Sequence, residues 1–161
     1  MREPHLGIDI GRVIIGGDGA DTQFLDGDEA SAMATPAVAG AFDAVADLMR
    51  LFDGKVWLVS KAGPRIQART RSWLDKRGFF DVTRLPRDHL RFCRERREKA
   101  DHALVLGLTH FIDDRFDVLR HLEGIVPHRF LFGPQRRPYA NGPTLTHVRD
   151  WQALLHAIKG T

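Results

Sequence analysis

Short apolar runs of strand length alternate with helical stretches along this chain, and this alternation limits its fold more than any other feature. Residues 6–10, 56–59 and 109–112 are apolar runs of the length of a buried strand. Between them, apolar residues recur at helical spacing in residues 38–52 and 66–74. Strands that alternate with helices of this size predict a parallel sheet with helices on both faces. The expected fold is therefore α/β: a three-layer, doubly wound, Rossmann-like domain.

Weaker patterns fill the rest of the chain. Residues 16–37 are rich in Gly, Asp, Ala and Thr and are expected to form a flap or irregular loop. Residues 134–145 also read as loop, and a closing amphipathic helix is expected over about 147–159. Four further segments are expected to be short strands: residues 12–15, 81–85, 89–93 and 128–132.

Composition is that of one globular domain spanning residues 1–161. The chain is 43% hydrophobic and 28% charged, which is unlike a disordered protein. No apolar stretch approaches the ~20 residues that cross a bilayer, so no membrane partner is expected. The lone cysteine, Cys93, excludes an internal disulfide framework, and no signal-peptide core follows Met1. These features predict a cytoplasmic protein. No feature of the sequence indicates an oligomeric state.

Basic residues are clustered although the net charge is only +3. The clusters lie at residues 65–77, 91–99 and 136–137. Such clusters attract phosphates or nucleic acid, but they are also typical of a solvated helix face. The charge pattern leaves both interpretations open.

Polar residues stand where three apolar runs end. Asp9 ends the first run, Ser60 ends the second, and Asp113-Asp114 closes the third. The carboxyl ends of parallel strands meet at one edge of a sheet, so these distant residues are expected to converge. Carboxylates there, with Lys99 from a basic stretch, are the parts of a Mg²⁺-assisted phosphoryl-transfer site. Capping of turns and helices is the alternative role for each residue.

This order of motifs resembles the haloacid-dehalogenase-like superfamily, most of whose members are magnesium-dependent phosphatases. Its first motif is Asp-x-Asp, its second a Ser or Thr at a strand end, its third a Lys or Arg, and its fourth an acidic pair. The matching residues are Asp9-Ile10-Gly11, Ser60, Lys99 and Asp113-Asp114, with Asp117 in reserve. The resemblance covers residues 6–132.

The resemblance implies a role for each matched residue. Asp9 would attack phosphorus to form an aspartyl-phosphate, which divides one difficult displacement into two easier ones. Mg²⁺ would be bound by Asp9, Asp113 and Asp114 and by the backbone carbonyl of Gly11. The phosphate would be bound by Ser60, Lys61 and Lys99, with the catalytic set being Asp9, Ser60 and Lys99.

One position departs from the superfamily pattern. Gly11 stands where the phosphatases carry a second aspartate, which acts as general acid and base. Such help is typically worth 10² to 10⁴-fold in rate. The flap acids Asp18, Asp21, Asp26 and Asp28 are candidates to replace it. The alternative is a binding or regulatory domain that keeps the metal and phosphate pocket but turns over slowly or not at all.

Few residues separate the first strand from the second helix-bearing unit, and one long helix uses much of that length, which leaves room for a minimal cap domain or none. In this superfamily, a nearly capless site accompanies large substrates or a cap supplied by a partner. The expected protein is thus a Mg²⁺-dependent phosphatase for a phosphorylated small molecule or nucleotide. A phosphate at a nucleic-acid end is a further candidate substrate, since basic clusters flank the predicted site. A receiver-like signalling domain fits less well, because receivers place the acidic pair after the first strand.

Overall fold

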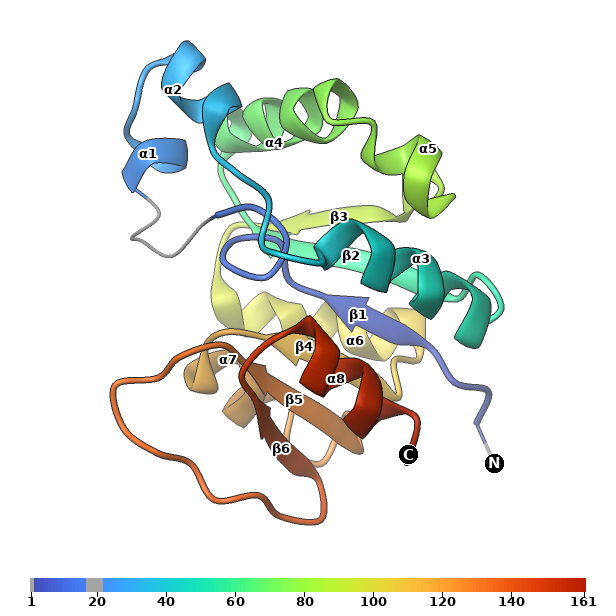
Figure 1. Ribbon diagram of the computed structural model, residues 1–161. Coiled ribbons are helices and arrows are strands. Elements are labelled where there is room, and N and C mark those ends of the chain that lie inside the picture. Colours follow the sequence, from blue (N-terminus) through green and yellow to red (C-terminus); the bar gives the residue numbers. More distant parts are fainter. Residues whose placement is uncertain (1, 17–21) are drawn as a thin grey trace.

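A six-stranded sheet forms the centre of the molecule (Figure 1). The computed structural model describes residues 2–16 and 22–161. Every neighbouring pair of strands is parallel, in the order β3-β2-β1-β4-β5-β6. The strands are β1 (Leu6–Ile8), β2 (Val56–Lys61), β3 (Leu90–Cys93), β4 (His110–Asp113), β5 (His128–Phe132) and β6 (Leu145–Val148). The parallel α/β sheet expected from the sequence is confirmed.

Helices follow most of the strands and cover both faces of the sheet. The helices are α1 (Thr22–Leu25), α2 (Glu29–Ala34), α3 (Ala41–Leu51), α4 (Pro64–Lys76), α5 (Phe79–Thr83), α6 (Lys99–Leu106), α7 (Phe116–His121) and α8 (Trp151–Ile158). Two short 3₁₀ turns, η1 (Arg87–His89) and η2 (Arg96–Glu98), precede β3 and α6. None of the described helices is long and apolar enough to cross a membrane.

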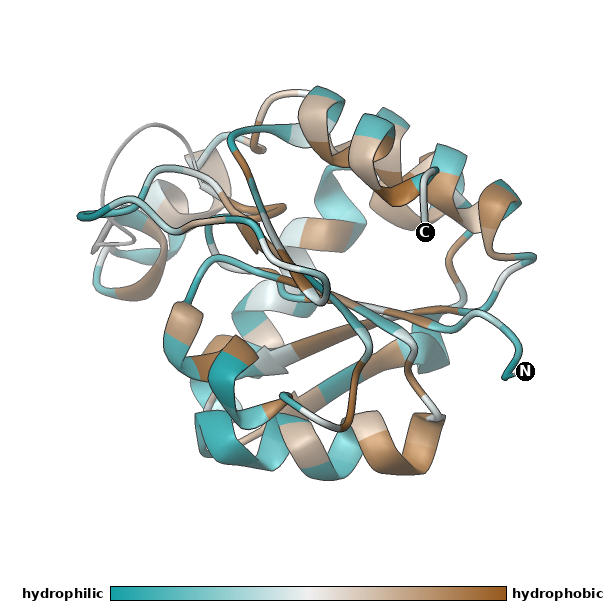
Figure 2. Cartoon of the chain, turned by 90° about the horizontal axis from the view of Figure 1, so that it is seen from below, coloured by the Kyte–Doolittle hydropathy of each residue, from teal (hydrophilic) through white to brown (hydrophobic). Residues whose placement is uncertain are grey.

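Two hydrophobic cores lie on opposite faces of the sheet. Apolar residues of α3, α4, α5 and α8 pack with Leu6 and Ile8 of β1. On the other face, α6 and α7 pack against Phe111 of β4 and Leu131 of β5. The brown, hydrophobic sides of the helices turn toward the sheet between the layers (Figure 2). Burial of both strand faces explains why these strands read as continuous apolar runs.

Residues 12–15 do not form the expected strand. The amides of Ile14 and Ile15 donate hydrogen bonds to the carbonyl of Ile10, at 2.8 and 3.1 Å, which bends the chain into a tight turn. Arg12 takes a positive φ of 62° within this turn. Trp151 of α8 donates its indole N–H to the Val13 carbonyl at 2.8 Å and holds the turn in place. These local and tertiary hydrogen bonds determine the backbone conformation here and override the β propensity of the residues.

Two further boundaries differ from expectation. Residues 79–83 form α5 rather than a strand over 81–85, because Gly78 at φ 70° redirects the chain and Phe79 and Thr83 are buried. The closing helix begins at Trp151 rather than near residue 147, because residues 145–148 pair with β5 as β6. Asp150 then caps α8, its side chain accepting from the Ala153 amide at 2.8 Å.

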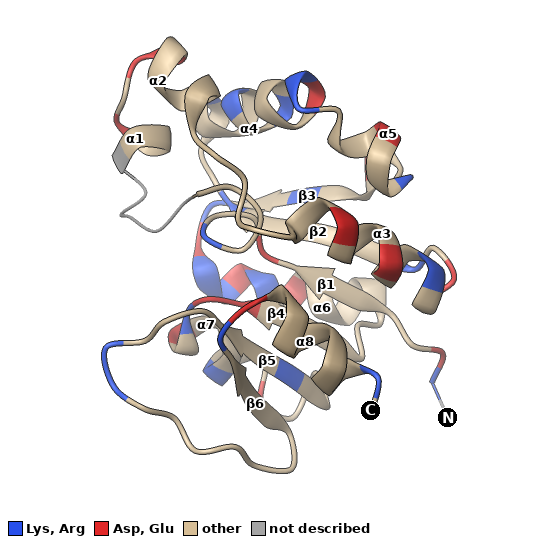
Figure 3. Ribbon diagram, in the orientation of Figure 1, with Lys and Arg blue, Asp and Glu red and all other residues tan. Residues whose placement is uncertain are grey.

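The described part of the expected flap, residue 16 with residues 22–37, contains α1 and α2 and is bound to α4. Arg69 donates to the carbonyls of Phe24 and Gly27, at 2.7 and 3.0 Å. Arg77 and Trp73 both donate to the Thr35 carbonyl, at 2.6 and 2.9 Å. Arg69 belongs to α4 and Arg77 directly follows it, and blue, basic positions lie along α4 beside α2 of the flap (Figure 3). Much of the basic cluster at 65–77 therefore serves to hold the flap. This role is neither of the two that the sequence suggested, which were binding of phosphates or nucleic acid and a solvated helix face.

Candidate active site

Adjacent strands bring the motif-one and motif-four acids together. β1 lies beside β4, with Ile8 opposite Ile112, and each strand is followed or ended by an aspartate. The amide of Asp9 donates to the Ile112 carbonyl at 2.9 Å, which continues the pairing past the end of β1. Asp9 and Asp113 are therefore fixed at one edge of the sheet by its register.

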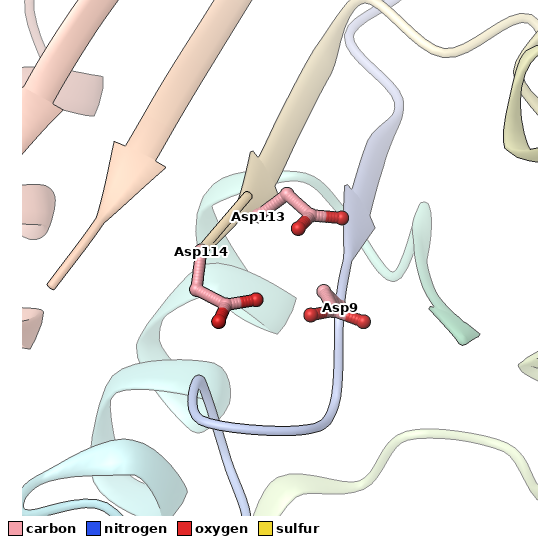
Figure 4. Close-up of side chains that lie close together, drawn as sticks. All are labelled: Asp9, Asp113 and Asp114. Atoms are coloured by element: carbon pink, nitrogen blue, oxygen red, sulfur yellow. The ribbon is translucent and has the colours of Figure 1, made fainter. Parts of the chain in front are cut away.

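Three carboxylates meet at this edge (Figure 4). Asp9, Asp113 and Asp114 each offer an oxygen, and these oxygens lie within 4.8 Å of one another. Asp113 is fully buried, Asp9 is buried and Asp114 is half-buried. Asp113 also accepts a hydrogen bond from the amide of Arg115 at 2.9 Å, which fixes its orientation.

Lys99 stands at the first position of α6 and reaches two of these carboxylates. Its Nζ lies 2.9 Å from Asp9 Oδ1 and 2.8 Å from Asp113 Oδ2. Burial alone would lower the pKa of Lys99, but the charges of Asp9 and Asp113 outweigh it and raise that pKa. Lys99 therefore stays protonated and neutralises part of the acidic cluster.

One ammonium does not balance three crowded carboxylates. Burial, followed by the Asp9 charge, raises the pKa of Asp113 to about 6. Burial and the charges of Asp9 and Asp113 raise the pKa of Asp114 to about 9. Carboxylate oxygens that repel one another in this way are suited to a hard divalent cation, which takes oxygen ligands. The donor set thus fits Mg²⁺.

A cavity of about 350 Å³ opens over the acidic cluster. The predicted site residues on its wall are Asp9, Gly11, Ser60, Lys61, Lys99 and Asp114. Phe24, Leu25 and Ile66 form an apolar part of the wall, and the first two belong to α1 of the flap. The flap therefore borders the site, whereas the sequence suggested an open site with a minimal cap.

Gly11 lies on the cavity wall with free space beside it. A Cβ built at Gly11 would meet no atom within 4 Å, and its φ is not in the positive region. A larger residue would thus fit the backbone at this position. The absence of the second aspartate leaves space rather than a rearranged wall.

Four flap acids were candidates to replace that aspartate, and the two that lie within the described residues do not reach the site. Asp28 caps α2 by accepting from the Ser31 amide at 2.8 Å, and this hydrogen bond lowers its pKa. Asp26 is exposed, and neither Asp26 nor Asp28 lines the cavity. Asp18 and Asp21 lie outside the described residues. Asp117, held in reserve for motif four, is exposed and 4.0 Å from Arg120 instead.

The sequence did not single out two basic residues of the cavity wall. Arg96 and Arg115 both line the cavity. Arg96 belongs to the basic stretch 91–99, in which only Lys99 was singled out, and Arg115 directly follows the acidic pair. Proximity to matched motifs was the one signal that could have identified either residue.

Comparison with known proteins gives a structural likeness only. No family model and no curated protein sequence matches the chain. A crystal structure of a haloacid dehalogenase-like family hydrolase from Xanthomonas campestris matches with a TM-score of 0.58 and 18% sequence identity. The match covers 81% of this chain and 58% of that one, so this chain spans little more than half of its length. The chain therefore has the fold of a haloacid-dehalogenase-like hydrolase.

Proposed function

We propose that this protein is a Mg²⁺-dependent phosphatase-like hydrolase with Asp9 as its nucleophile. One observation carries the proposal: Asp9, Asp113 and Asp114 converge within 4.8 Å beside a buried lysine, and two of them, Asp9 and Asp114, line a cavity. A capping role would explain each acid alone, but it would not require a buried Lys99 between two of them. The cytoplasm is the proposed location, in keeping with the reduced, buried Cys93.

The chain's own residues would share the chemistry as follows. A carboxylate oxygen of Asp9 attacks phosphorus while the bond from phosphorus to the leaving oxygen breaks, which gives an aspartyl-phosphate. Asp9, Asp113, Asp114 and the Gly11 carbonyl would hold Mg²⁺, which would supply positive charge that offsets repulsion between nucleophile and phosphate. Ser60 and Lys61 would bind phosphoryl oxygens, and Lys99, whose Nζ lies 2.9 Å from Asp9 Oδ1, would hold that carboxylate in position. Water then hydrolyses the aspartyl-phosphate and frees Asp9.

Gly11 limits which substrates should react fastest. It supplies no proton to the leaving oxygen, so a leaving group that departs as a stable anion should be favoured. Aryl phosphates have such leaving groups and are suitable first substrates. The proposed natural substrates are a phosphorylated small molecule, a nucleotide or a phosphate at a nucleic-acid end.

Hydrolysis of an aryl phosphate, measured with and without Mg²⁺, tests the proposal. We expect turnover that requires the metal and disappears in Asp9→Asn, while Asp117→Asn, an exposed acid outside the cavity, retains it. Metal-independent turnover would contradict the proposed requirement for Mg²⁺. Turnover that survives in Asp9→Asn would contradict the assignment of Asp9 as the nucleophile.

The second candidate is a binding or regulatory domain with the same fold. The observation that favours it is Gly11, because neither Asp26 nor Asp28 lines the cavity to replace the missing aspartate. Absence of turnover with Mg²⁺ and phosphate still bound would select this alternative.

A further inference from the structure

Arg96 and Arg115 supply positive charge to the cavity that the binding of one phosphate does not explain. Both line the same cavity as Asp9. Among the described residues, neither the Arg96 side chain nor the Arg115 guanidinium forms a hydrogen bond or a salt bridge. Arg115 does act electrostatically on Asp114, lowering its otherwise raised pKa. Arg96 is half-buried and lines this partly enclosed space.

The charges around the cavity show the surplus. Its cationic residues are Lys61, Arg96, Lys99 and Arg115, and the carboxylates of its acidic cluster are those of Asp9, Asp113 and Asp114. The cations outnumber the carboxylates even before a divalent metal is added. A metal ion and a phosphate dianion would leave that surplus unchanged. A second negative group on the substrate would remove it.

We propose that the substrate is a phosphomonoester with a second anionic group, and that Arg96 binds this group. The inference rests on the proposed function, since it assumes that the phosphoryl group occupies the end of the cavity at Asp9. A guanidinium is the side chain best suited to a carboxylate or a second phosphate, because its fork donates two parallel hydrogen bonds. Arg115, which lines the same cavity, would add positive charge.

The size and lining of the cavity favour a small substrate. Its volume of about 350 Å³ is at the lower end of the range typical of small-molecule sites. Phe24, Leu25 and Ile66 would contact the carbon skeleton between the two anionic groups. The cavity joins a wider groove, and both are lined by Gly16, Pro36 and Arg115. The groove is also lined by Arg136 and Arg137, from the loop after β5. A longer polyanion, such as an oligonucleotide end, would have to extend along this groove.

Arg97 provides a matched control for Arg96. It is the next residue of η2, it is exposed, and its Nε lies 2.8 Å from Glu95. It does not line the cavity. A change at Arg97 therefore removes the same charge from the same turn without touching the proposed contact.

The test uses two pairs of substrates that differ in one anionic group. Phosphoglycerate is compared with glycerol phosphate, and a nucleoside bisphosphate with the corresponding monophosphate, through kcat/KM in Mg²⁺. We expect the doubly anionic member of a pair to be favoured by about 10- to 100-fold, as befits one charge-assisted contact. Arg96→Gln should bring this ratio close to one, and Arg97→Gln should leave it unchanged. The pair with the larger ratio identifies the second group as carboxylate or phosphate.

Other outcomes would overturn the inference. Equal kcat/KM values within both pairs, or an unchanged preference in Arg96→Gln, would show that Arg96 recognises no second anion. A preference only for phosphorylated oligonucleotides, lost in Arg136→Gln and Arg137→Gln, would assign recognition to the groove instead. If no compound is hydrolysed, the proposed function fails, and binding then tests the inference separately. The melting temperature of the protein in Mg²⁺ is measured with each member of a pair. The doubly anionic member should raise it more in the wild type and in Arg97→Gln, but not in Arg96→Gln.

Discussion

The ammonium of Lys99 lies 2.9 Å from Asp9 Oδ1, although 90 positions separate the two residues. The contact joins the start of α6 to the end of β1. The same Nζ lies 2.8 Å from Asp113 Oδ2, so one buried cation is shared between two buried carboxylates. This arrangement places a positive charge between the two acids and fixes their positions before any ligand binds.

Removal of the Lys99 charge should destabilise the fold. Lys99→Met would leave the carboxylates of Asp9 and Asp113 buried without their cation, at a cost of about 3–5 kcal/mol. Urea denaturation in metal-free buffer measures the change in the free energy of unfolding. Lys61→Met is the control, because Lys61 is exposed and a surface change is usually within about 0.5 kcal/mol. Equal stability of the two variants would contradict the buried-pair account.

The sequence was sufficient to predict the sheet and much of its acidic edge. Asp9 and Asp113 follow buried apolar runs, and parallel strands necessarily place such residues at one edge. The turn at residues 12–15 escaped prediction because it depends on hydrogen bonds to Ile10 and on distant Trp151. Strand β6 escaped because its pattern is short and its partner, β5, lies across a loop.

The flap over residues 16–37 was expected, but its attachment to α4 and Arg77 was not, for a different physical reason. Its stability depends on Arg69, Trp73 and Arg77 donating to backbone carbonyls 38 to 45 positions away. Any residue offers a carbonyl, so such a contact leaves no pattern in the segment that accepts it. The same limit applies to Arg96, whose place on the cavity wall depends on how η2 packs.

Mg²⁺ should stabilise the protein through the acidic cluster. A ligand that binds only the folded state at 100 times its Kd adds about 2.7 kcal/mol. We expect the melting temperature to rise with Mg²⁺ in the wild type and in Asp117→Asn, and not in Asp114→Asn. Asp117 is the matched acid, because it lies three positions on and is exposed. An equal rise in all three proteins would place the metal elsewhere.

His110 should make stability depend on pH. Burial, with a smaller contribution from the charge of neighbouring His128, lowers the pKa of His110 from 6.5 to about 4. The unfolded chain therefore binds the proton more readily, so the stabilisation is complete above pH 6.5 and is lost as the pH falls toward 4. The loss should be on the order of 3 kcal/mol. His110→Gln should flatten this part of the stability profile, whereas His121→Gln, at an exposed histidine, should not.

The flap should loosen when Arg69 is replaced. Arg69→Met removes the donors to the Phe24 and Gly27 carbonyls and should cost about 1–3 kcal/mol. Amide hydrogen exchange in α1 and α2 should accelerate, since these helices are too short to be stable alone. Arg71→Met is the control, because exposed Arg71 lies over the Phe92 ring and not against the flap. Unchanged exchange in Arg69→Met would show that the flap is held by other contacts.

A gain of activity at position 11 would be the most direct sign of phosphatase chemistry. The space beside Gly11 admits a side chain, since an added Cβ meets no atom within 4 Å, and Gly11 lines the cavity with Asp9. Gly11→Asp should therefore raise kcat for an alkyl phosphate by about 10²-fold or more, because its leaving oxygen needs a proton. Aryl phosphates need less help and should gain less. Gly11→Asn has nearly the same size and no acid, so it should give no gain. A similar gain from both variants would assign the effect to shape rather than to proton transfer, and no gain from Gly11→Asp would favour the binding domain.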